Sequence, residues 1–66
     1  MRSSGAALCL LIELSDDEAW AFAQFLKRVA VDDYRRLAVD GEEAYAMQSA
    51  GEALGRALAA QGYAPR

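Results

Sequence analysis

The chain opens on a segment in which large apolar side chains alternate with other residues. Every second position is aliphatic, at Leu8, Leu10, Ile12 and Leu14. A period of two is typical of a β-strand, whose successive side chains point to opposite faces. Leucine is also a good helix former, so one or two extra helical turns are the competing interpretation. A lone strand lacks a neighbour in its own chain. We therefore predict pairing across a homodimer, with these four residues at or near its interface.

A helical period follows this segment. Ser15 and Glu18 have the spacing of a capping box, in which each side chain binds the backbone N–H of the other residue. Acidic residues in the first turn, with Lys27 and Arg28 near the end, suit the helix dipole. Together these features predict a helix from about Asp16 to Val29. Its apolar positions are Ala19, Phe22, Leu26 and Val29, flanked by Trp20, Ala23 and Phe25.

The rest of the pattern predicts a short helix and a long one. Residues 32–38 are helical in propensity, with Asp32 as a candidate cap and a break near Val31. Alternatively the first helix runs on, since no Gly or Pro interrupts it. Asp40 and Glu43 repeat the capping spacing before a long apolar run that Gly62 ends, with Tyr63 expected to pack back on Leu58. This run carries two predicted seams, Met47-Gly51-Leu54-Leu58 and Ala46-Ala50-Ala53-Ala57.

The predicted fold is therefore mainly α: a short N-terminal strand, then two long helices with a short helix between them. Residues 1–7 are expected to form a flexible N-terminus, and residues 8–66 a single small domain. A chain of 66 residues buries only about 60% of its unfolded surface, so its stability is marginal. Small domains are usually supported by disulfides, a metal or a partner. The single cysteine excludes an internal disulfide, and the absence of histidine argues against a zinc site, which leaves association.

Composition also narrows the function classes. Without histidine the chain offers no nucleophile–base pair, and its acidic pairs lie at helix starts, where capping explains them. We expect no enzymatic activity and no cofactor or metal. A net charge of −3 argues against direct nucleic-acid binding. No stretch reaches the roughly 20 apolar residues that span a bilayer, and acidic residues follow the N-terminal apolar stretch where a signal peptide would be cleaved. We expect a cytoplasmic protein without membrane contact.

The remaining candidates for function are surface residues. Aromatic and arginine residues are enriched at binding hot spots, and the candidates here are Trp20, Tyr34, Arg35 and Arg36. Core packing for Trp20 and a solvated surface for the arginines are the plainer interpretations. Gly51 and Gly55 form a G-x-x-x-G pattern, which indicates close approach of two helices, either within the fold or across a dimer.

Three stretches of the chain resemble a group of small proteins found in phages, plasmids and integrative elements of GC-rich proteobacteria. They are residues 14–29 (LSDDEAWAFAQFLKRV), 43–47 (EAYAM) and 62–66 (GYAPR). That group has no known activity. The resemblance implies a non-enzymatic accessory protein of a mobile element that binds a host protein complex stoichiometrically, with inhibition of a CRISPR effector as the most concrete form. The alternative is a small dimeric transcriptional regulator or structural protein of such an element.

Overall fold

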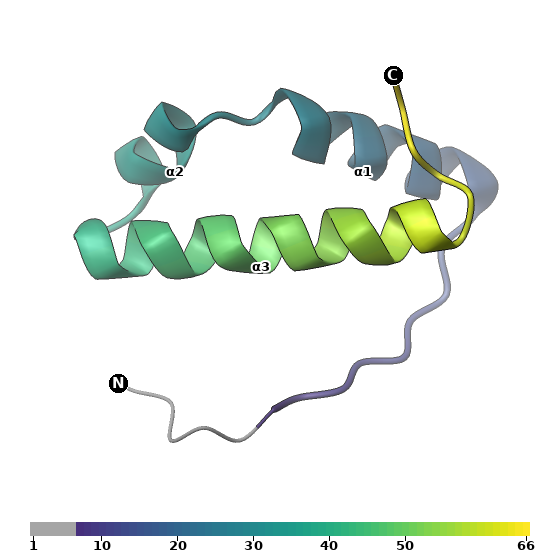
Figure 1. Ribbon diagram of the computed structural model, residues 1–66, viewed down its shortest axis with the longest axis horizontal. Coiled ribbons are helices and arrows are strands. Elements are labelled where there is room, and N and C mark those ends of the chain that lie inside the picture. Colours follow the sequence, from purple (N-terminus) through teal and green to yellow (C-terminus); the bar gives the residue numbers. More distant parts are fainter. Residues whose placement is uncertain (1–6) are drawn as a thin grey trace.

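A computed structural model describes residues 7–66, which form three helices: α1 (Asp16–Arg28), α2 (Val31–Leu37) and α3 (Gly41–Ala60). Figure 1 shows α1 and α2 following one another along one side of α3, with the C-terminal residues returning toward α1. Both shorter helices pack against α3. The mainly helical prediction is confirmed. The expected flexible N-terminus falls, except for its last residue, outside the described residues.

The predicted N-terminal strand is wrong. Residues 7–15 adopt neither strand nor helix, and no strand occurs anywhere in residues 7–66. The four alternating side chains are exposed, from 80% at Leu8 to 45% at Leu14. A strand needs a neighbour for its backbone hydrogen bonds, and the described chain provides none. Alternation of apolar residues was therefore insufficient to predict a strand.

The helical alternative for this segment also fails, because α1 begins where its cap places it. Ser15 has extended backbone angles (φ −68°, ψ 164°). Its Oγ accepts the N–H of Glu18 at 3.0 Å, while Glu18 Oε1 accepts the N–H of Ser15 at 2.8 Å. The predicted capping box is thus present. It satisfies two backbone donors that an α-helix start leaves unpaired.

The predicted break between the first two helices is confirmed, two residues before the expected place. Val29 leaves the helix in an extended conformation (φ −67°, ψ 135°), and α2 starts at Val31. The candidate cap was wrong: Ala30 holds the N-cap position, and Asp33 Oδ2 accepts its N–H at 2.9 Å. Because the helix starts one residue before Asp32, it is Asp33 that reaches back to the cap.

Both ends of α3 follow the predicted signals. At the start, Asp40 Oδ1 accepts the N–H of Glu43 at 2.9 Å, and Glu43 Oε1 accepts the N–H of Val39 at 2.7 Å, one residue beyond the expected partner. At the end, Gly62 has a positive φ of 99°. The N–H of Tyr63 bonds to the carbonyl of Leu58, and that of Gly62 to the carbonyl of Ala59. This pair of bonds is the Schellman motif.

The contact between the helices is built from small residues. The buried positions are Ala19 and Ala23 on α1, and Ala44 and Gly51 on α3. Of the predicted seams, Met47 and Leu58 are half-buried, whereas Leu54 stays 42% exposed. All four positions of the alanine seam are exposed. Within residues 7–66 no large side chain is fully buried, so the core is thin and most large apolar side chains lie around it.

Candidate interaction surfaces

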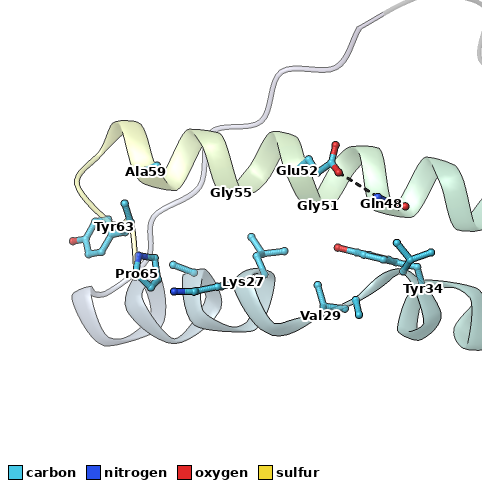
Figure 2. A pocket seen from close by; sticks show the side chains of 15 residues that line it. Lys27, Val29, Tyr34, Gln48, Gly51, Glu52, Gly55, Ala59, Tyr63 and Pro65 are labelled. Atoms are coloured by element: carbon cyan, nitrogen blue, oxygen red, sulfur yellow. Dashed lines mark hydrogen bonds between the residues drawn. The ribbon is translucent and has the colours of Figure 1, made fainter.

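The tightest approach between α2 and α3 is that of Tyr34 to Gly51. The Tyr34 side chain points at α3, as Figure 2 shows. A Cβ atom built on Gly51 would lie 3.3 Å from Tyr34 Cζ and closer still to the hydroxyl oxygen, a separation that real Cβ atoms essentially never show. Only glycine leaves this space. The first half of the G-x-x-x-G pattern is therefore explained by packing within the fold.

Beside this contact runs a groove between α3 and the two shorter helices, with a cavity volume of about 590 Å³. Lys27 of α1 and Glu52 of α3 lie on its opposite walls, and the Gln48 amide donates a 3.3 Å hydrogen bond to Glu52 (Figure 2). Gly55 also lines the groove, and a Cβ atom added there would meet no atom within 4 Å. Packing within the chain does not require the second glycine of the pattern.

One end of the groove is closed by the C-terminal segment. The Tyr63 ring packs edge-on against Trp20, with ring centroids 5.1 Å apart and an interplanar angle of 72°. The Tyr63 hydroxyl donates a 2.7 Å hydrogen bond to Asp16 Oδ1. This bond to a carboxylate favours the neutral phenol and raises the pKa of Tyr63 above its ordinary value. Two contacts therefore tie the chain end after the Schellman motif to the start of α1.

The four residues predicted to bind a partner do not form one surface. Trp20 lies near the start of α1 beside Tyr63, while Tyr34 belongs to α2 and lies against Gly51 in the middle of α3. Trp20 remains 39% exposed. Of the four residues, only Arg35 and Arg36 lie together as exposed neighbours on α2.

Both of these arginines are exposed and have acidic partners one turn earlier. Arg35 lies 3.9 Å from Asp32, and Arg36 lies 3.0 Å from Asp33. The Ala30 N–H hydrogen bond, supported by Arg36, holds the pKa of Asp33 below its ordinary value. Exposed pairs of this kind contribute little to stability, so a partner's carboxylate can replace the internal acid at little cost.

An exposed apolar surface lies on α1. Phe22 and Phe25 stack on each other, with centroids 5.4 Å apart and an interplanar angle of 19°, and remain 41% and 53% exposed. The available signal was the width of the apolar arc of α1, which is too broad for one contact line with α3. We call this stacked pair of rings the phenylalanine face, and Phe25 also lines a hollow that it shares with Arg36 and Leu37 of α2.

The described residues hold few groups with reactive chemistry. Within residues 7–66 no three His, Cys, Asp or Glu side chains cluster in a way that could hold a metal ion. Cys9 is exposed and unpaired. No helix in this part of the chain has the length and apolar character needed to cross a membrane. The features that stand out are the groove, the α2 arginines and the phenylalanine face.

Comparison with known proteins places the chain in a family. The model of a family of unknown function (DUF7706) matches residues 1–66. The chain belongs to this family. No curated protein and no solved structure matches it. The family description assigns no activity.

Proposed function

We propose that this protein acts by stoichiometric binding to a partner protein and not by catalysis. The observation that carries this proposal is the distribution of large apolar side chains. None is fully buried within residues 7–66, and thirteen remain exposed, among them Leu37 at 72% and Val39 at 85%. Exposed apolar residues next to arginines resemble binding surfaces more than the surface of a self-contained monomer.

The first surface to test is the one around the end of α2, formed by Arg35, Arg36, Leu37 and Val39. The two guanidinium groups can each hold a carboxylate through two hydrogen bonds. The aliphatic side chains beside them offer apolar contact area. This arrangement suits a partner with an acidic patch bordered by apolar residues.

The resemblance to proteins of mobile elements gives this proposal its most specific form. In that form the partner is a host protein complex, and the protein inhibits it by occupancy, as an anti-CRISPR protein would. The support for this form is the resemblance alone. The alternative function is that of a small dimeric transcriptional regulator or structural protein of a phage or mobile element.

A quantitative pull-down with the tagged protein tests the proposal. Tagged wild type should retain one host component at a fixed molar ratio, and the dissociation constant should then be measured with that component purified. Arg35→Ala/Arg36→Ala should weaken binding by about 30-fold, which corresponds to roughly 2 kcal/mol. Arg56→Ala, which removes an exposed arginine from α3, is the matched control and should bind as wild type does.

Circular dichroism should show the same helix content for all three proteins. Equal affinity of wild type and the double variant would exclude the α2 surface. Turnover of a substrate by sub-stoichiometric amounts of protein would overturn the non-enzymatic proposal. Retardation of duplex DNA by the purified protein at physiological salt would instead support the regulator.

A further inference from the structure

The hollow beside Phe25 lies where α1 ends and α2 begins. Its volume is about 420 Å³, and it shares only Val29, the residue that ends α1, with the groove. In the described part of the chain, α1 and α2 each pack on α3 and not on each other, which leaves this space between them. Both helices line it with charged and apolar side chains, among them Phe25, Arg28, Asp33, Arg36 and Leu37.

The charges that line the hollow are not balanced. Asp33 already has partners: Oδ2 accepts the Ala30 N–H at 2.9 Å, and Oδ1 accepts a guanidinium N–H of Arg36 at 3.0 Å. A guanidinium carries five N–H donors, so Arg36 keeps most of its donors for another acceptor. Arg28 is exposed and forms no ion pair within residues 7–66. Two arginines against one aspartate leave a surplus of one positive charge, on a chain whose net charge is −3.

The rest of the lining is mainly apolar. Phe25 and Leu37 contribute exposed side chains to the hollow, one from each helix. Stacking on Phe22 already orders the ring of Phe25, so the ring loses little conformational freedom when another side chain packs on it. A phosphate backbone would use only the arginines and would leave this apolar surface uncovered. A carboxylate next to an apolar side chain uses both parts of the lining.

We propose that this hollow binds an acidic segment of the partner protein. A carboxylate of that segment is bound by Arg28 and Arg36, and an adjacent aliphatic or aromatic side chain packs on Phe25 and Leu37. Arginine binds carboxylates through paired hydrogen bonds, and the positive surplus of the hollow is complementary to negative charge. Clusters of arginines recognise acidic motifs in other proteins. This binding mode rests on the proposed function, and it adds Phe25 and Arg28 of α1 to the surface at the end of α2.

Defined peptides test the chemistry of the ligand. The probe is a short fluorescein-labelled peptide that alternates glutamate with leucine. Two matched peptides replace either its glutamates by lysine or its leucines by serine. Fluorescence anisotropy at about 150 mM salt should give the glutamate–leucine peptide a dissociation constant about tenfold lower than that of either matched peptide. Absence of binding up to about 1 mM, or equal binding of either matched peptide, would overturn the proposal.

Single substitutions test whether the peptide binds in the hollow. Phe25→Ala and Arg28→Ala should each weaken binding of the glutamate–leucine peptide by about tenfold. Lys27→Ala and Tyr45→Ala are the matched controls, because these side chains are exposed but do not line the hollow. Both controls should bind as wild type does, and circular dichroism should show the same helix content for all four variants. Unchanged binding of Phe25→Ala or Arg28→Ala, or an equal loss in a control, would place the ligand elsewhere and overturn the proposal.

The same variants separate this binding mode from the proposed function. In the pull-down, Phe25→Ala and Arg28→Ala should each weaken retention of the partner, as Arg35→Ala/Arg36→Ala does. Retention that falls in the double arginine variant but not in Phe25→Ala or Arg28→Ala would refute the hollow as the binding site and leave the proposed function standing.

Discussion

The phenol of Tyr34 occupies the space that a side chain at position 51 would take, and Gly51 leaves it free. This contact joins α2, a helix of seven residues, to the middle of the longest helix. A helix that short has little stability alone, because nucleation costs more than a few hydrogen bonds return. The position of α2, and with it that of Arg35 and Arg36, therefore depends on a glycine seventeen residues away.

Alanine substitutions at the two glycines of α3 should have opposite effects. Gly51→Ala should destabilise the fold by about 1–3 kcal/mol, because the added methyl group forces Tyr34 out of its place. Gly55→Ala should stabilise it by up to about 1 kcal/mol, because its Cβ meets nothing and alanine is the better helix former. Urea unfolding at one fixed protein concentration measures both changes.

A double variant identifies the cause of the Gly51 effect. Tyr34→Phe removes the hydroxyl that the new methyl group would meet first. Gly51→Ala should therefore cost less in a Tyr34→Phe background than in wild type. Equal costs in the two backgrounds, or a stabilising Gly51→Ala in wild type, would contradict the packing described here.

Local signals predicted the helices well. Ser15 with Glu18 marked the start of α1, Asp40 marked that of α3, and Gly62 marked its end, because a cap and a left-handed turn depend on residues within a few positions. The start of α2 was misplaced: Asp32 was the candidate cap, whereas Ala30 holds the N-cap position two residues earlier, and helix boundaries are the least certain part of a prediction from sequence.

Features that depend on distant residues were not predictable in the same way. The period of two over residues 8–14 indicated a strand, yet a strand exists only where a neighbour pairs with it. The spacing of Phe22 fitted a core position. In the structure the buried contact follows Ala19 and Ala23 instead, because only small side chains fit between closely packed helices. The Tyr34–Gly51 contact follows from the angle between two helices, which no local pattern contains.

The C-terminal cap of α3 offers a second test of stability. Gly62→Ala should destabilise the protein by about 1 kcal/mol, since alanine resists the φ of 99° that the Schellman motif requires. Gly41→Ala is the matched control: that glycine has no positive φ and no neighbour near its Cβ position, so the change should not destabilise. Thermal melting at one concentration compares them. An unchanged midpoint for Gly62→Ala would mean that the motif contributes nothing.

Tyr63 should lose its proton at a higher pH than an ordinary tyrosine. The hydrogen bond to Asp16 stabilises the neutral phenol, so the folded pKa exceeds the unfolded value of about 10. This contribution to stability is fully present below the unfolded pKa and is lost as pH rises through the folded pKa. Ultraviolet titration of wild type against Tyr63→Phe isolates its phenolate signal. Asp16→Asn should shift that signal to lower pH, and an unmoved signal would refute the bond.

We infer that one chain leaves a large apolar surface that a partner covers. In the absence of other proteins, a second copy is the partner available, and association with the folded state alone raises its apparent stability with concentration. The most direct measurement is the melting temperature of purified wild type over a hundredfold range of protein concentration. We predict a midpoint that rises steadily across this range. A midpoint that stays constant, with a reversible transition at every concentration, would show that the folded monomer is stable by itself and would contradict the account.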